Sequence, residues 1–130
     1  MPILERLIYV STAAQGIALP EVRHIVARAQ IRNRQLDVTG MLLFMQGEFV
    51  QVLEGRRAML DQVVQYISGD PRHHGIQLIE RRRVSTRRFD RWHMGLIVTD
   101  AMADAVSRMK QGELSVDTVI DALLADADLF

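Results

Sequence analysis

The chain has 130 residues, enough for one domain with a substantial core, and it contains no cysteine, which excludes disulfides, thiolate metal sites and a cysteine nucleophile. Hydrophobic residues make up 48% and charged residues 25% of a chain without a signal-peptide start or a membrane-length apolar run, so we expect a soluble cytoplasmic protein with no membrane contact. The net charge is zero but uneven: from Asp100 onward seven acidic residues oppose two basic ones. Such an acidic tail could dock on the basic body, or the two surfaces could be solvated independently.

The first half of the chain alternates strand-like and helix-like segments. An apolar run predicts a strand over residues 4–11. Apolar residues at i, i+3, i+4 and i+7 over residues 22–29 predict a helix, with Pro20 at its first position. Residues 39–54 predict two strands joined by a tight turn at Gln46-Gly47.

The second half repeats this alternation and then becomes helical. The helical spacing returns over residues 60–67, and Gly69 ends that segment. Residues 74–98 predict a second pair of strands that turns at "VSTRR". Two short amphipathic helices follow, separated by Gly112, with Ser115 as the cap of the second.

The order of elements, βαββαββ and then αα, predicts an α+β fold. We expect a ferredoxin-like mixed sheet with two helices on one face, formed by residues 1–98. Residues 99–130 are expected to form a C-terminal two-helix cap. Within this cap, Met102, Met109 and Leu124 could either remain exposed for a dimer contact or cover the open face of the sheet.

One polar side chain stands out in the stretch "GEFVQVLEG", residues 47–55. Apolar residues on both sides of this strand predict burial on two faces, yet Gln51 lies in its middle. A buried amide left unpaired costs roughly 1–3 kcal/mol, so Gln51 needs partners. Strand alternation allows Tyr9, in the first strand, to face the same side and bond to it. The amide would still have capacity for a further partner, such as a heterocycle bound between the two helices.

The sequence gives little support to catalytic motifs, metal sites or nucleic-acid binding. No phosphate-binding loop, dinucleotide fingerprint or nucleophile elbow is present, and the four histidines have no zinc-site spacing, so we expect no metal. A run of arginines could bind nucleic acid, but only seven aromatic residues are available for base stacking, and alternation explains most of the run as the wet side of a strand pair. We therefore do not expect nucleic acid binding. The run comprises Arg81, Arg82, Arg83, Arg87, Arg88 and Arg91.

Five blocks between Leu4 and Val98 resemble, in order and spacing, those of BLUF domains, the blue-light sensors that use FAD. The blocks are "RLIYVS", "NRQLDVTGMLLF", "GEFVQVLEG", "DPRHHGI" and "RRFDRWHMGL". The remaining 32 residues are too few for an effector domain and resemble the helical cap of short stand-alone members. The resemblance implies FAD as the cofactor, with FMN possible, and a switch rather than an enzyme.

The resemblance also implies roles for polar residues. Tyr9 matches the photoactive tyrosine of the family, and Gln51 matches the glutamine between that tyrosine and the flavin ring. Asn33 matches the asparagine that holds the polar edge of the ring, and its neighbour Arg32 occupies a position that varies in the family.

Further matches concern the walls and the exit of the site. Ile25 and Ile67 would sandwich the ring, or simply be core residues, and Phe49 would close one side. Arg72 and His73 correspond to groups near the ribityl-phosphate end of the cofactor. The output pair of the family is matched by Trp92 and Met94, which strand alternation places on one face of a strand expected beside that of Gln51.

The mechanism implied by the resemblance is a hydrogen-bond switch. Excitation of the flavin removes an electron and then a proton from the tyrosine, and the glutamine relays the proton and returns with rearranged bonds. Output would be a changed contact with a downstream protein effector, and a homo-oligomer is expected. The alternative is a light-independent interaction or RNA-binding module on the same fold.

Overall fold

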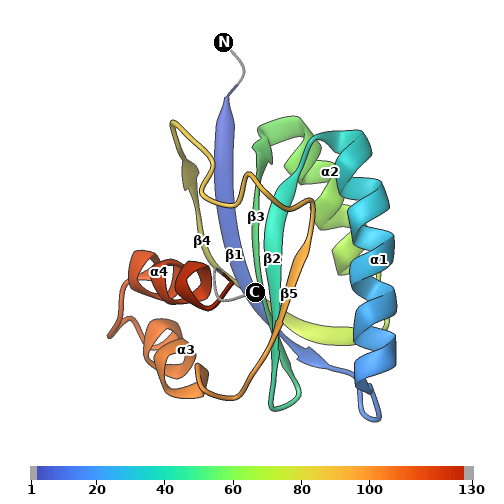
Figure 1. The fold of residues 1–130 in the computed structure, drawn as a ribbon, viewed down its shortest axis with the longest axis vertical. Helices are drawn as coiled ribbons and strands as arrows, with labels where there is room; N and C mark the ends of the chain where they lie inside the picture. Colours follow the sequence, from blue (N-terminus) through green and yellow to red (C-terminus); the bar gives the residue numbers. More distant parts are fainter. Residues whose placement is uncertain (1–2, 128–130) are drawn as a thin grey trace.

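The computed structural model describes residues 3–127 as a five-stranded sheet between two pairs of helices (Figure 1). Residues beyond this range, including Asp128 of the acidic tail, lie outside the described part. The elements are β1 (Leu4–Ala13), α1 (Leu19–Leu36), β2 (Thr39–Met45), β3 (Glu48–Arg56), α2 (Arg57–Ser68), β4 (His73–Arg83), β5 (Gly95–Val98), α3 (Ala103–Lys110) and α4 (Val116–Ala127). The predicted order of elements is confirmed.

The turns and helix ends that short sequence signals predicted are present in the structure. Gln46 and Gly47 both have positive φ (46° and 76°), which is the geometry of the tightest hairpins, and they join β2 to β3. Gly69 ends α2 as predicted, and Pro20 is the second residue of α1, one position later than expected. The hydroxyl of Ser115 accepts a hydrogen bond from the backbone N–H of Thr118 at 3.1 Å and so caps α4.

The strand order is β4-β1-β3-β2-β5, and neighbouring strands are antiparallel except for β2 and β5. The first four strands have the ferredoxin-like order, and β5 extends the sheet. The predicted pairing of the last two strands is wrong, because β4 and β5 form opposite edges of the sheet. A tight turn cannot join strands at opposite edges, so residues 84–94 form a crossover segment that spans the sheet (Figure 1).

Because β4 and β5 are not neighbours, the arginine run does not lie on a pair of strands. Arg81, Arg82 and Arg83 end β4, whereas the other three arginines lie in the crossover segment and not on a strand. The neighbours of β3 are β1 and β2, so Gln51 does not lie next to β5, the strand that follows Trp92 and Met94.

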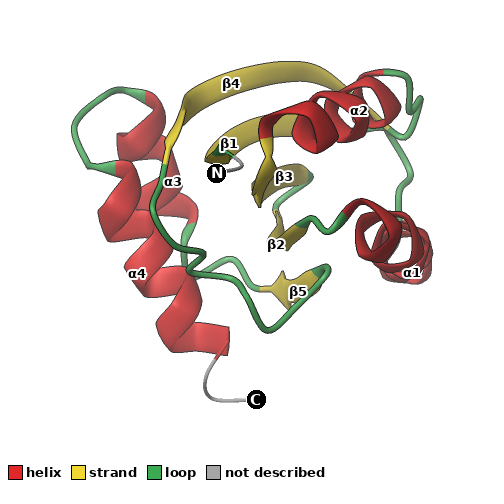
Figure 2. Cartoon of the chain, turned by 90° about the horizontal axis from the view of Figure 1, so that it is seen from above, coloured by secondary structure: helices red, strands yellow, loops and turns green. Residues whose placement is uncertain are grey.

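Both faces of the sheet are covered by helices (Figure 2). One face packs against α1 and α2, with Leu7, Phe49 and Leu53 in the core between them. The opposite face packs against α3 and α4, where Met102 and Met109 are buried. These two methionines therefore cover the sheet, whereas Leu124 is half-buried against the same core.

The acidic tail contacts the basic body. Arg82 at the end of β4 pairs with Asp117 at 3.1 Å, and Arg88 in the crossover segment pairs with Asp121 at 2.5 Å. Both aspartates lie on α4, so the cap is joined to the sheet by charge as well as by apolar packing. No helix in residues 3–127 combines the length and the apolar character needed to cross a bilayer.

Candidate functional site

Tyr9 and Gln51 form a buried polar pair on the α1/α2 face of the sheet. They are directly opposite each other in the β1–β3 ladder, and each is only 5% exposed. The Tyr9 hydroxyl donates a hydrogen bond to Oε1 of Gln51. Burial raises the pKa of Tyr9 well above its ordinary value, against the opposing effect of Arg32, so the phenol remains a proton donor. The predicted partnership of these two side chains is confirmed.

The other end of the Gln51 amide contacts a weak acceptor. Its Nε2 atom donates to the sulfur of Met94 at 3.5 Å, which is the one hydrogen bond of that nitrogen among residues 3–127. A thioether accepts hydrogen bonds poorly, and an amide nitrogen carries two N–H groups. Gln51 therefore keeps donor capacity for another partner.

The placement of Trp92 and Met94 differs from the prediction. Both precede β5 rather than lying within it, so strand alternation does not apply to them. Met94 is buried in the core on the α1/α2 face, whereas Trp92 packs on the α3/α4 side, with the guanidinium of Arg91 over its ring. The two side chains thus point to opposite sides of the sheet, and only Met94 reaches Gln51.

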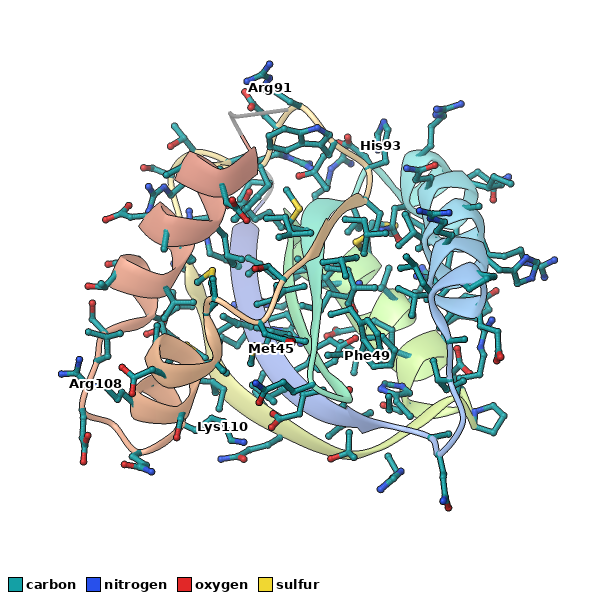
Figure 3. The ribbon with its side chains drawn as sticks, turned by 60° about the horizontal axis from the view of Figure 1, so that its bottom comes forward. Met45, Phe49, Arg91, His93, Arg108 and Lys110 are labelled. Carbon is teal, nitrogen blue, oxygen red and sulfur yellow. The ribbon has the colours of Figure 1, made fainter. Side chains whose placement is uncertain are left out.

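A pocket opens beside the Tyr9–Gln51 pair, between the sheet and helices α1 and α2. Its empty space, including the open mouth, is about 570 Å³. Ile25 from α1 and Ile67 from α2 line it, as do Leu42 and Phe49 from the sheet. Figure 3 shows Phe49 on the side of the sheet that faces these helices. The pocket thus has apolar walls and a polar phenol–amide floor.

Charged groups surround the mouth of the pocket. The Arg32 guanidinium lies 5.4 Å from the centre of the Tyr66 ring, and burial lowers its pKa. Arg72 pairs with Asp70 at 2.7 Å, and the hydrogen bonds from Arg72 lower the pKa of this carboxyl group. Arg28 also lines the pocket. Three guanidinium groups and one carboxylate therefore leave the mouth with an excess of positive charge.

His73 and Asn33 stand beside this pocket with their polar atoms engaged. One ring nitrogen of His73 lies 2.7 Å from the carbonyl oxygen of Ile67 and must donate to it, so in the neutral ring the other accepts from Ser11 at 2.8 Å. Asn33 is fully buried, and its amide donates to the carbonyl of His93 at 2.7 Å. His93 lies in the crossover segment, near α1 (Figure 3). Among the predicted cofactor residues in the described chain, Asn33 alone does not line the pocket.

The pocket also contains residues that the sequence analysis did not identify. Leu42 is the β2 partner of Gln51 in the ladder, and the hairpin register alone could have revealed it. Arg28 and Ala29 follow Ile25 at i+3 and i+4 on α1, so helical spacing carried this signal. No group of three or more metal-binding side chains is found within residues 3–127.

The fold and this pocket define a ligand-binding α+β domain, and comparisons with known proteins identify its class. The profile of the BLUF family, "Sensors of blue-light using FAD", matches residues 4–95. The Escherichia coli "Blue light- and temperature-regulated antirepressor BluF" is 36% identical over 93 residues, which cover 72% of this chain and 23% of that protein. The Euglena longa "Photoactivated adenylate cyclase subunit beta" is 27% identical over 124 residues, covering 90% of this chain and 14% of that protein.

Solved structures agree with this assignment. BlrB, a BLUF protein in its dark state, has a TM-score of 0.78 at 28% identity, with 95% of this chain and 93% of that chain covered. Klebsiella pneumoniae BlrP1 with FMN and cyclic diGMP has a TM-score of 0.72 at 29% identity, with 95% and 35% covered.

The chain belongs to the BLUF family and is a flavin-based blue-light sensor. It spans 9–14% of the length of the first cyclase relatives, so their catalytic activity belongs to other regions and this domain is a sensor rather than an enzyme.

Proposed function

We propose that the protein senses blue light through the hydrogen bond between Tyr9 and Gln51 and passes the signal on through protein–protein contacts. The observation that carries this proposal is the buried phenol–amide pair at the floor of the pocket. The amide has one strong partner and one weak partner, which is the state from which its bonding can most easily rearrange.

The residues around the pocket fit a flavin. Ile25, Ile67 and Phe49 would contact the faces and side of a flat ring, and Asn33 and Arg32 would stand at its polar edge. A guanidinium offers a planar fork of donors to phosphate, so Arg72, with His73 beside it, suits the phosphate end. FAD is the cofactor that the family description names, and FMN is the second candidate because a related structure contains it. A bound flavin would supply absorption of blue light and accept an electron.

The chain itself would move one proton and reorder one amide. Tyr9 is placed to release its hydroxyl proton to Oε1 of Gln51, the atom to which it already donates. Rotation or tautomerisation of the amide would then exchange its donor and acceptor positions. Giving up the bond to Met94 costs little because sulfur is a weak acceptor.

The signal would leave the pocket through the contact between Gln51 and Met94. Met94 lies in the crossover segment just before β5, and the segment is joined through Arg88 to α4. We therefore treat residues 1–98 as the photosensory unit and residues 99–130 as the part that presents the changed surface. Its partner would be an unidentified effector or a second copy of the chain in the cytoplasm.

Absorbance spectra before and after blue illumination test this function. The purified protein should be yellow, and its flavin band should shift to the red and recover in the dark. Tyr9→Phe should retain the flavin and lose the shift, because the donated proton is absent. Tyr66→Phe removes an exposed hydroxyl at the pocket mouth and should retain both. A normal photocycle in Tyr9→Phe would contradict the role of Tyr9, and a chain that binds no flavin would contradict the whole proposal.

The light-independent alternative requires arginines in this run that are not already paired with carboxylates. Arg81 pairs with Glu5 and Asp61, at 2.7 Å each, so a nucleic acid would have to replace carboxylates to use it. Arg87 is similarly bound to Asp37. These pairs favour the sensor over an RNA-binding module.

A further inference from the structure

A second concave site lies on the surface of the molecule, where the end of β4 and the crossover segment meet α4. We call it the arginine groove, and its empty space is about 830 Å³, much of it open to solvent. Its lining is mainly basic and hydroxylic and comprises Arg6, Arg82, Arg83, Ser85, Thr86 and Arg88. Asp117 and Asp121 of α4 also line the groove.

Part of this basic lining is without partners. Within residues 3–127, the exposed side chain of Arg83 forms no hydrogen bond or ion pair. The same holds for the hydroxyl groups of Ser85 and Thr86, which follow after Val84. Arg6, by contrast, is buried and neutralised by Glu54 at 2.8 Å. The unsatisfied donors of the groove are therefore concentrated at residues 83–86.

The other two arginines are held by replaceable partners. Arg82 binds Asp117 and Arg88 binds Asp121, and both carboxylates are more than half exposed. Exposed ion pairs contribute little to stability, so an anion that enters the groove can take the place of either carboxylate. The two aspartates thus show which kind of ligand these arginines accept.

The chemistry of the groove suits phosphate more than other anions. Guanidinium groups bind phosphate oxygens in pairs, and hydroxyl groups in a turn add single donors. Among residues 3–127 no aromatic side chain lines the groove, so this part of the chain offers no platform on which a base could stack. We infer that the arginine groove binds the phosphate groups of a small ligand in competition with Asp117 and Asp121. The inference does not depend on the flavin.

Calorimetric titration of the full chain with sodium tripolyphosphate, at low ionic strength in a phosphate-free buffer, tests the site. Arg83→Gln should weaken binding by about tenfold, because one charge-assisted contact is lost. Arg23→Gln removes the same charge from an exposed position on α1 that has no ion-pair partner among residues 3–127, and it should leave the affinity unchanged. Equal losses in the two variants would overturn the inference in favour of general charge attraction.

A second test removes the competing carboxylates of α4, and here the affinity for tripolyphosphate should rise. The double variant Asp117→Asn/Asp121→Asn should bind tripolyphosphate more tightly than the unaltered protein, since the two competing carboxylates of α4 are gone. Glu80, 3.6 Å from Arg82, is the same in both proteins. Asp104→Asn/Glu113→Gln changes the net charge equally, at exposed positions without ion-pair partners in the described part of the chain, and should have a much smaller effect. If both double variants gain affinity equally, or if the first gains none, the competition is refuted.

The source of the phosphate can be distinguished with two further probes. Sedimentation with vesicles containing a phosphatidylinositol phosphate, lost in Arg83→Gln, would assign the groove to a lipid headgroup. Binding of tripolyphosphate without binding to these vesicles would assign it to a soluble ligand. A single-stranded RNA that binds more tightly than tripolyphosphate and is insensitive to Arg83→Gln would overturn the inference.

Discussion

Glu54 is a fully buried carboxylate whose role appears only from its partners. It accepts a hydrogen bond from Arg6 at 2.8 Å, and its oxygens also accept from the backbone N–H groups of Arg88 and Phe89 at 2.6–3.0 Å. One side chain of β3 thereby holds the crossover segment against the end of the sheet. The charge is paired and its lone pairs are used, which is the condition under which a buried ion pair can be retained.

Replacement of this carboxylate should be costly. Glu54→Gln is expected to lower the free energy of unfolding by about 3–5 kcal/mol, because Arg6 would remain buried and charged without its counter-ion. Glu80→Gln, at a position with a side chain 38% exposed, should change it by less than about 1 kcal/mol. Urea unfolding followed by circular dichroism measures both, and similar values for the two variants would disprove the role of Glu54.

The hairpin of β2 and β3 is the element that fixes the pocket floor, and it depends on one close approach. A Cβ atom added to Gly40 would overlap the carbonyl oxygen of Val52 on the neighbouring strand. The absence of a side chain at Gly40 therefore sets the distance between the two strands, and with it the position of Gln51 one residue before Val52.

Gly40→Ala should separate these strands. We expect the free energy of unfolding to fall by at least about 1–3 kcal/mol, since the carbonyl oxygen of Val52 cannot move away without breaking the β2–β3 ladder. Gly69→Ala is the matched control, because the backbone there has φ −90° and the nearest atom to an added Cβ is 3.6 Å away. Thermal unfolding should show a lower midpoint for Gly40→Ala only, and equal midpoints would contradict the steric argument.

The molecule as a whole consists of a sheet with a pocket on one face and a helical cap on the other. The crossover segment connects them: Met94 touches Gln51 on the pocket side, while Trp92 packs among the apolar side chains that join the cap to the sheet. In the proposed function, a rearrangement at Gln51 would reach the cap through its contact with Met94 and the short stretch of chain to Trp92, without a large movement of the sheet.

Hydrogen exchange in darkness and under blue light tests this path. Backbone amides of residues 84–98 and of α3 and α4 should exchange at different rates in the two conditions, since their packing depends on the crossover segment. In Tyr9→Phe with flavin bound, illumination should leave these rates unchanged. A protein that shows the red shift but no change in exchange over residues 84–127 would rule out this route.

Features governed by near neighbours in the chain were predictable. Strand alternation allowed Tyr9 and Gln51 to share one face, and the Gln46-Gly47 turn set the register of the hairpin. The resemblance to BLUF domains added a role for each residue of the pocket, and these roles remain predictions that the proposed spectra address.

The sequence by itself determined which segments are helices and strands, which faces are apolar and which family the chain resembles, because these depend on spacing and on residue types in order. Only the tertiary structure decided that β4 and β5 form opposite edges, that Met94 and Trp92 face opposite sides, and that the methionines of the cap cover the sheet. An apolar run or stripe states that a face must be buried but not against what. That choice is made by contacts between residues far apart in the chain, such as those of Glu54 with the crossover segment.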